Sequence, residues 1–128
     1  MRTLWLLAAC TIIPTMACHH GAAPARRGIT SDTTPPASVR VENKHWLDVA
    51  IYVEHEGLRQ RLGTVTAAST ADFTLRPSMI SGLGDVELIA DAIGSHASAA
   101  TGRLTVKPGM HVEWTLQIDL SRSNVSVY

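Results

Sequence analysis

The sequence predicts an all-β fold, a single antiparallel β-sandwich of Greek-key, Ig-like architecture with about eight short strands, after a signal peptide and a disordered tether. Apolar and polar residues alternate from Val39 onward, as they do in strands that bury one face. Turn-forming residues separate these segments at close spacing, and no segment has the period of a helix. We therefore expect two sheets packed face to face over residues 38–128, with an open barrel as the alternative fold.

Residues 1–17 have the regions of a secretory signal peptide in the usual order. Arg2 is a single charge near the start, an apolar run follows at residues 4–13, and Pro14 leads into small or neutral residues. The apolar run is too short to span a bilayer. We therefore expect this leader to direct secretion and then to be removed.

The junction after the leader, from Thr15 to Cys18, resembles the lipobox of bacterial lipoproteins, in which a small residue precedes a cysteine. The resemblance implies that Cys18 is acylated, and more than one acyl chain gives stable membrane attachment. It also implies a location in the bacterial envelope. Because His19 rather than an aspartate follows the cysteine, the resemblance favours the outer membrane, facing the periplasm or the cell surface. The alternative is an ordinary secretory signal cleaved near Ala17 or Ala23.

Residues 18–37 are expected to form the lipidated cysteine and a disordered tether. The segment contains three prolines, no periodicity, and no large apolar residue except Ile29. Treated as a flexible coil, it has an end-to-end distance of roughly 25 Å. The folded domain is therefore expected to stand off the bilayer surface.

The expected strands follow one another along the rest of the chain, each with its apolar residues on one side. Their inward-facing residues are Val39 and Val41; Leu47, Val49, Ile51 and Val53; Leu58, Leu62 and Val65; Ala71, Phe73 and Leu75; residues 86–90; residues 104–106; Met110, Val112, Trp114, Leu116, Ile118 and Leu120; and Val125 and Val127. Gly63 interrupts the alternation, which predicts a β-bulge. We expect a helical turn at residues 76–80 to connect the sheets, and the small residues at 92–100 to form a flexible loop.

Charge and cysteine content exclude several classes of function. Without its leader the chain has ten Lys and Arg residues against eleven Asp and Glu residues, with no basic stripe, so nucleic acid is not an expected partner. Cys10 leaves with the leader and Cys18 is committed to lipid, so we expect no disulfide in the domain. A blue-copper site is excluded as well, because it requires a thiolate.

Histidines are the main candidate metal ligands that the pattern offers, with Met110 next to His111 as a further candidate. His19 and His20 are adjacent on the tether, and His111 shares the outward face of a strand with Glu113. A periplasmic lipoprotein that binds copper or zinc through these histidines is therefore the alternative function. Metal sites need three or four convergent ligands, and no such spacing occurs in the domain, so no cofactor is expected.

The pattern contains no catalytic motif. There is no GxSxG elbow, and the segment Gly94-Ser95-His96 lies in the run of small residues that we expect to be a loop. We therefore expect a protein that is not an enzyme.

Recognition by a surface is the remaining hypothesis: an interaction or assembly module that binds an envelope protein or a glycan. Trp46 and Tyr52 fall on the same alternate row and form an exposed aromatic strip if that face is open; if the second sheet or the tether covers it, they are ordinary packing. An apolar loop at the helical turn is suited to closing one end of the sandwich or to contacting a partner. The candidate partner-binding residues are Trp46, Tyr52, Met79, Ile80 and Leu83. The last strand, which ends at Tyr128, is also a candidate for pairing with a strand of a partner.

Overall fold

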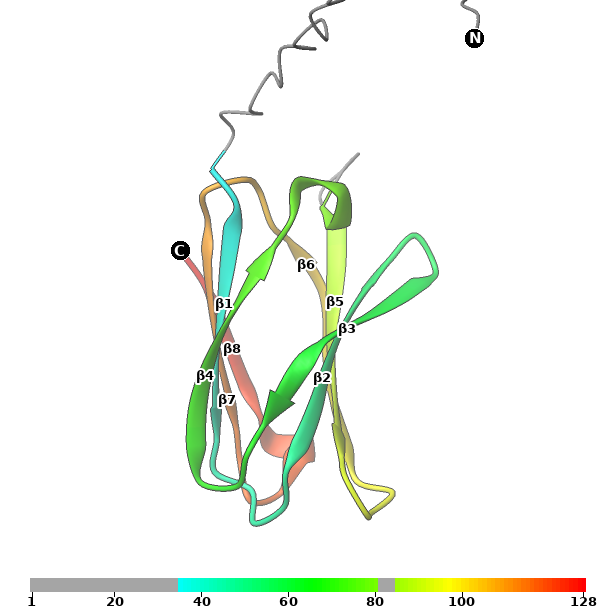
Figure 1. Cartoon of the computed structure of the whole chain (residues 1–128), viewed down its shortest axis with the longest axis vertical. Coiled ribbons are helices and arrows are strands. Elements are labelled where there is room, and N and C mark those ends of the chain that lie inside the picture. The colour runs from blue at the N-terminus through cyan, green and yellow to red at the C-terminus, as the bar shows by residue number, and fades with distance from the viewer. Residues whose placement is uncertain (1–34, 81–84) are drawn as a thin grey trace, which may run out of the picture. The chain divides into compact units, whose positions relative to one another are not determined.

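The computed structural model describes residues 35–80 and 85–128. Cys18, the tether histidines and Leu83 lie outside these ranges, so the expectations made for them stay predictions. Figure 1 shows the described residues as two β-sheets that face each other across a core. The all-β sandwich predicted from the alternating pattern is confirmed.

The sandwich has eight strands and two short 3-10 turns, and each sheet contains four strands. In chain order the elements are β1 (Ala37–Asn43), β2 (Val49–His55), β3 (Leu58–Val65), β4 (Ser69–Leu75), η1 (Pro77–Met79), β5 (Asp85–Ala92), β6 (Ser98–Thr105), β7 (His111–Leu116), η2 (Leu120–Arg122) and β8 (Asn124–Val127). The turn η1 lies on the connection from β4 in one sheet to β5 in the other, where a helical turn was expected. The first strand begins at Ala37, which is fully buried, so the fold starts one residue before the predicted boundary at 38.

One sheet has the order β4-β1-β7-β8 and the other has the order β3-β2-β5-β6. The chain crosses from one sheet to the other after β1, and β4 returns to lie beside β1, as in a Greek key. In the immunoglobulin order the first two strands share a sheet, whereas here β1 and β2 lie in different sheets, so the likeness is one of architecture only. The described strand pairs are antiparallel except β1–β7, which is parallel. The alternation in the sequence could not show this, because it is the same in both directions.

The core lies between the sheets and is filled by the alternate residues of their strands. Trp114 is its largest fully buried side chain, and it is packed among valine, leucine and isoleucine side chains of both sheets. The inward positions predicted for β1, β2, β5 and β7 are buried: Val39, Val41, Val49, Ile51, Val53, Val86, Leu88, Ala90, Val112, Trp114 and Leu116. Packing of these side chains accounts for the stability of a domain that has no cysteine.

Four inward predictions were wrong or only partly right, for reasons of strand length. Ile118 is 72% exposed because β7 ends at Leu116, and the chain then turns into η2. Leu58 is 63% exposed because the β2–β3 hairpin extends beyond the side of the sandwich (Figure 1). Leu47 precedes the first residue of β2 and is half-buried, and Val127 is exposed near the end of the chain.

Bulges interrupt both edge strands of the second sheet. In β3, Ile51 is opposite Gly63 and Tyr52 is opposite Arg61, so Leu62 is the extra residue and the predicted bulge is confirmed. A Cβ atom at Gly63 would lie 2.7 Å from the Phe73 ring, which is why this position carries no side chain. The register of β6 also shifts, next to Gly102 with its φ of 71°. The segment 92–100 is thus not all loop, since β6 begins at Ser98.

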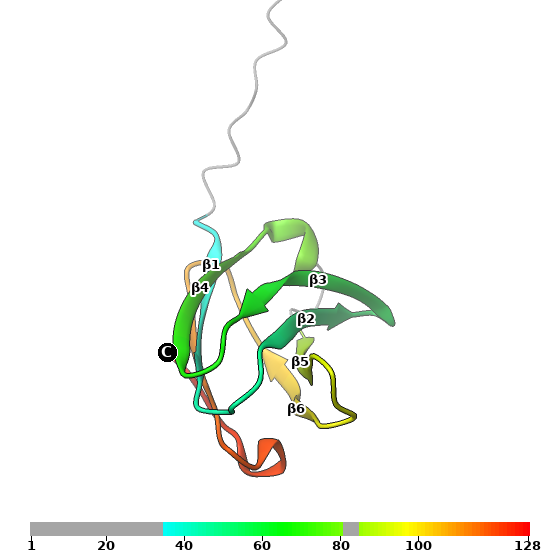
Figure 2. The same ribbon diagram turned by 60° about the horizontal axis from the view of Figure 1, so that its bottom comes forward.

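The strand register assigns each loop to one end of the sandwich. One end of the sandwich, which we call the proximal end, contains residue 35, the β2–β3 and β6–β7 turns, η1 and Tyr128. A Cβ atom at Gly109 would lie 3.3 Å from Pro35, so the chain reaches the sandwich beside the β6–β7 turn. The loops β1–β2, β3–β4, β5–β6 and β7–β8 share the opposite end, the distal end, which is turned forward in Figure 2.

Candidate functional site: the distal patch

Three large apolar side chains are exposed on three different loops of the distal end. Trp46 of the β1–β2 loop is 71% exposed, Ile93 after β5 is 49% exposed, and Ile118 after β7 is 72% exposed. We call these three residues the distal patch. The other exposed large apolar side chains of the described residues lie toward the proximal end. Leu58 belongs to the β2–β3 hairpin, and Val127 and Tyr128 are the last two residues of the chain.

The loop that carries Trp46 is built on a buried amide. Asn43 is 1% exposed, and its Nδ2 donates to the carbonyl oxygens of Leu47 at 2.9 Å, Thr66 at 3.1 Å and Val65 at 3.3 Å. Its Oδ1 accepts a hydrogen bond from the backbone N–H of His45 at 2.9 Å. One side chain therefore fixes the β1–β2 loop and joins it to the β3–β4 turn.

His45 extends this frame to Trp46. The imidazole is 4% exposed, and its Nδ1 accepts a hydrogen bond from the backbone N–H of Leu47 at 3.1 Å. In the neutral ring the proton is therefore on Nε2. The Trp46 ring packs against this imidazole with centroids 5.4 Å apart and planes tilted by 32°. The buried, hydrogen-bonded imidazole thus supports one side of the exposed indole.

Asp48 connects the same loop to two other loops. Its carbonyl oxygen accepts a hydrogen bond from the backbone N–H of Ile93 at 2.8 Å, and its carboxylate accepts one from the backbone N–H of Ala67 at 2.9 Å. These bonds hold the tip that carries Ile93 against the base of the loop that carries Trp46.

The third member of the patch, Ile118, is placed by the turn η2. The backbone N–H of Lys44 donates to the carbonyl of Leu116 at 2.8 Å, which joins the β1–β2 loop to the end of β7. Asp119 caps η2 by accepting hydrogen bonds from the hydroxyl of Ser121 at 2.7 Å and from its backbone N–H at 3.1 Å. These bonds to Ser121 lower the pKa of Asp119 below its usual value.

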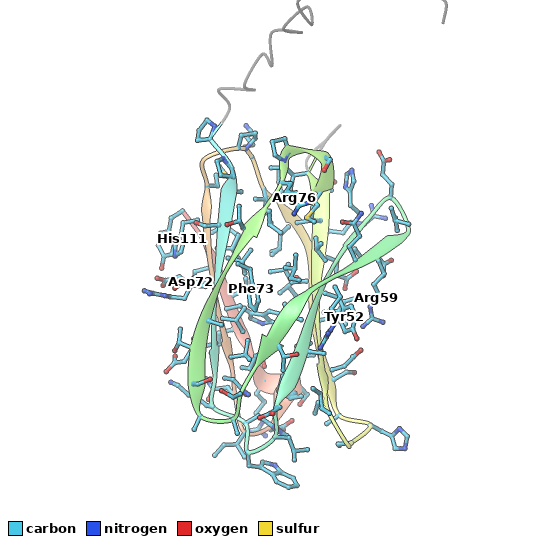
Figure 3. The ribbon with its side chains drawn as sticks, viewed as in Figure 1. Tyr52, Arg59, Asp72, Phe73, Arg76 and His111 are labelled. Atoms are coloured by element: carbon cyan, nitrogen blue, oxygen red, sulfur yellow. The ribbon has the colours of Figure 1, made fainter. Side chains whose placement is uncertain are left out.

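Tyr52 does not join Trp46 in an aromatic strip. Trp46 lies in the loop before β2, whereas Tyr52 is the fourth residue of the strand and is half-buried. The guanidinium of Arg59 covers the Tyr52 ring at 4.2 Å and is paired with Asp91 at 2.6 Å (Figure 3). The expected strip was wrong because the period of two begins only at Val49.

The described apolar residues of the segment predicted as a loop, Met79 and Ile80, pack toward the core at the proximal end. Ile80 is 4% exposed and belongs to the core, and Met79 is half-buried against it. Of the two uses predicted for this loop, the packing of these residues supports closure of the sandwich rather than contact with a partner.

The structure places Ser38, which the sequence did not point to, beside the His111 and Glu113 pair predicted to share one strand face. His111 Nδ1 is 2.8 Å from the Ser38 hydroxyl, and its Nε2 is 3.6 Å from the Glu113 carboxylate. The serine-histidine-aspartate relay of proteases joins the serine to Nε2 and the carboxylate to Nδ1, so the two ring nitrogens are exchanged here; catalysis also needs a substrate pocket and oxyanion donors. A neighbouring hollow of about 320 Å³ is lined by Glu113 but not by Ser38 or His111. Ser38 and His111 therefore lie outside this hollow, and only Glu113 of the three faces it.

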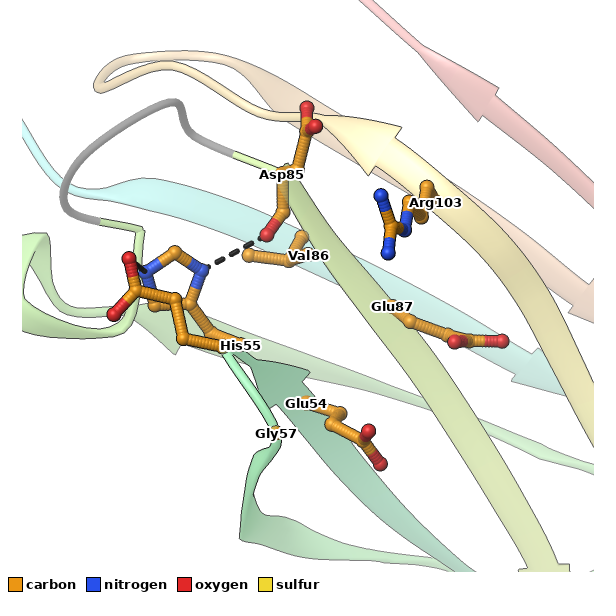
Figure 4. Close-up of a pocket in the computed structure, with 8 residues that line it drawn as sticks. Glu54, His55, Gly57, Asp85, Val86, Glu87 and Arg103 are labelled. Carbon is orange, nitrogen blue, oxygen red and sulfur yellow. Dashed lines mark hydrogen bonds and ion pairs between the residues drawn. The ribbon is translucent and has the colours of Figure 1, made fainter.

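A hollow of about 370 Å³ opens near the β2–β3 hairpin and is rich in carboxylates (Figure 4). His55 Nδ1 is 2.8 Å from the carbonyl oxygen of Asp85 and must be the donor, since a carbonyl only accepts. Its Nε2 is 3.8 Å from the Glu56 carboxylate. The wall also contains Glu54 directly opposite Glu87, with Arg103 beside them.

Neither this hollow nor His111 forms a metal centre. Among residues 35–80 and 85–128, no group of three or more His, Cys, Asp and Glu side chains could hold a metal ion. Copper and zinc sites need at least that number of protein ligands. The predicted contribution of His19 and His20 lies outside the described residues.

Comparison with known proteins found no family model and no curated protein that matches the chain. One solved structure, described as the NMR structure of the protein from Eubacterium rectale, covers 76% of this chain and 90% of its own, with 19% identity and a TM-score of 0.43. In the part of the chain that the structure describes, no helix is long and apolar enough to cross a membrane.

Proposed function

We propose that this chain is a lipoprotein of the bacterial envelope, anchored through Cys18, and that its β-sandwich is a non-enzymatic interaction module. The partner binds at the distal patch. The observation that carries this proposal is the support of Trp46, an exposed indole held by the buried side chains of Asn43 and His45. Buried polar side chains beneath an exposed aromatic residue are typical of a preorganised contact surface.

The chemistry of the distal patch favours a protein partner over a glycan. One indole and two branched aliphatic side chains from separate loops offer area for apolar contact, and such residues form the centre of protein interfaces. Charges of both signs lie nearby, with Lys44 and Arg122 against Asp48 and Asp119, so electrostatic attraction is not the main contribution.

The location of the patch supports anchoring from the other side of the domain. The chain reaches the sandwich at Pro35 on the proximal end, beside the β6–β7 turn. A tether that pulls on this end leaves the distal loops unobstructed. A tether of the length predicted from the sequence, roughly 25 Å between its ends, would allow the domain to turn toward a partner above the membrane surface.

The anchor is tested by metabolic labelling with an alkyne fatty acid in a bacterium that expresses the full-length chain. We expect label in the membrane fraction, and we expect Cys18→Ala to abolish the label and to release the protein. A Cys18→Ala protein that is still labelled would overturn the anchor. A Cys18→Ala protein that stays in the membrane fraction without the label would do the same.

The binding surface is tested separately, with a photoreactive benzoylphenylalanine at position 46 in intact cells. We expect one reproducible crosslinked protein, lost when Ile118→Asp is also present. The matched control is the same amino acid at position 58, which is also exposed but lies at the proximal end. Equal crosslinking from both positions, or none from position 46, contradicts the proposed surface, and a crosslink to glycan alone replaces the protein partner.

A further inference from the structure

We propose that the free edge of β4 accepts an extended segment of another polypeptide as an additional antiparallel strand. This site differs from the distal patch, and it does not depend on acylation. The proposal follows from the direction of the backbone groups in β4, from the state of the other sheet edges, and from the charge at the centre of the strand.

Hydrogen bonds of β1 fix the direction of the backbone groups in β4. Ser38 and Lys44 donate their N–H groups to β7, so the even-numbered residues of β1 point toward β7 and the odd-numbered residues point toward β4. The odd residues Val39 and Val41 are opposite Phe73 and Ala71. In an antiparallel pair, two residues that lie directly opposite each other either exchange both backbone hydrogen bonds or exchange none. Phe73 and Ala71 are therefore bonded to β1.

The alternate residues of β4 point their backbone groups away from the sheet. They are Thr70, Asp72 and Thr74, and all three are exposed. Among the described residues, no hydrogen bond reaches their N–H or C=O groups from the side away from β1. The edge thus offers three N–H and three C=O groups in one row, the arrangement that strand addition uses.

The other sheet edges are less suited to a new strand. The edge strands β3 and β6 both contain bulges, which disrupt the regular spacing of edge groups. His111 and Tyr128 exchange both backbone hydrogen bonds, so only Val125 and Val127 of β8 point outward. The last strand, predicted from the sequence as the site of pairing, is therefore the shorter edge. By contrast, β4 pairs with β1 through seven consecutive residues without a shift.

The side chains of β4 indicate what the added strand contains. Asp72 is its only charged residue and pairs with Arg40 at 3.0 Å on the outer face. Phe73 points to the inner side, where it is half-buried beside Gly63 (Figure 3). The added strand therefore carries apolar residues in the positions next to Phe73. On the other face it carries a basic or hydroxyl residue opposite Asp72.

The same charge argues against a second copy of this chain as the occupant. A two-fold pairing of β4 with itself that uses all three outward residues places Asp72 directly opposite Asp72 of the second copy. Like charges at directly opposite positions destabilise a strand pair. The occupant is thus a segment of a different polypeptide.

The test measures hydrogen exchange of the full-length protein, purified in mild detergent, with and without a capped seven-residue peptide. The peptide has valine at its odd positions, threonine at positions two and six, and lysine at the central position four. We expect slower exchange at the amides of Thr70, Asp72 and Thr74. The amides of Ala71 and Phe73, already bonded to β1, should not change. A peptide with a central glutamate should bind about two- to fivefold more weakly, because the glutamate faces Asp72.

A proline on the edge provides the matched pair of variants. Thr74→Pro removes one outward N–H but no bond to β1, and edge strands tolerate proline in such positions. We expect it to abolish the protection by the peptide while the melting temperature stays close to that of Thr74→Ala, which keeps the N–H and binds. In the unmodified protein, absence of protection at millimolar peptide overturns the proposal. The proposal is also overturned if the peptide protects the amides of Val125 and Val127 in β8 instead. Protection of the β4 amides that increases with protein concentration in the absence of peptide would overturn it as well.

Discussion

Replacing Asn43 with alanine tests whether a single buried amide organises the distal end. The amide satisfies the buried Val65 carbonyl at 3.3 Å and the buried His45 N–H at 2.9 Å. Its bonds to Leu47 and Thr66 are only partly buried, so water can replace them. Val49 lies opposite Val65 and points toward β3, because its neighbour Asp48 is bonded to Ile93 on the β5 side, so the Val65 carbonyl keeps a partner in the ladder. The His45 N–H loses its partner, and one such buried backbone group predicts a loss of about 1–3 kcal/mol in the free energy of unfolding.

The loss is measured by urea denaturation followed by tryptophan fluorescence, together with thermal melting. A domain of this size loses about 4–8 °C in melting temperature per kcal/mol, so the expected decrease is about 4–24 °C. The control is Asn124→Ala, an exposed position in β8 that should change stability by no more than about 0.5 kcal/mol. If Asn43→Ala costs as little as the control, the buried frame does not hold the loops and the argument for a preorganised patch fails.

Three further predictions concern single positions. Gly63→Val should destabilise the domain by about 1–3 kcal/mol in urea denaturation, because its Cβ meets Phe73, and a variant of unchanged stability contradicts the packing described. The pKa of Asp119 is lowered, so the capping bonds to Ser121 are present at neutral pH and are lost as the pH falls through that pKa; an NMR titration of Ser121→Ala should show the Asp119 value rising toward its usual range. Ile118→Ser should leave the melting temperature nearly unchanged, since the side chain is exposed, while the crosslink from position 46 weakens; a large fall in melting temperature would instead assign Ile118 a structural role.

The alternation in the sequence was sufficient to predict the sandwich and most of its core, because one face of each strand must be apolar. It could not predict where a strand stops. The period of two continues through Ile118, yet β7 ends at Leu116, and the residue that looked like core is part of the distal patch. Strand ends depend on tertiary contacts of η2, which no local pattern contains.

The candidate site was only partly visible in the sequence for a similar reason. Trp46 was singled out as an exposed aromatic residue, but its support comes from Asn43 and from carbonyl groups of the β3–β4 turn. Ser38 and His111 are 73 residues apart in the chain and become neighbours only through the parallel pairing of β1 with β7. Polar side chains between strands look like ordinary loop residues until the fold shows which backbone groups they satisfy.

The central position of β1 has a mechanical consequence. This strand is the first of the domain, and it lies between β4 and β7, bonded to both. A force applied between a membrane anchor and a partner at the distal end would act along β1 and load its hydrogen bonds in shear, all at once rather than one by one. Bonds loaded in this way share the force, so we expect the domain to resist extension from its N-terminus more strongly than peeling of β8 from its C-terminus.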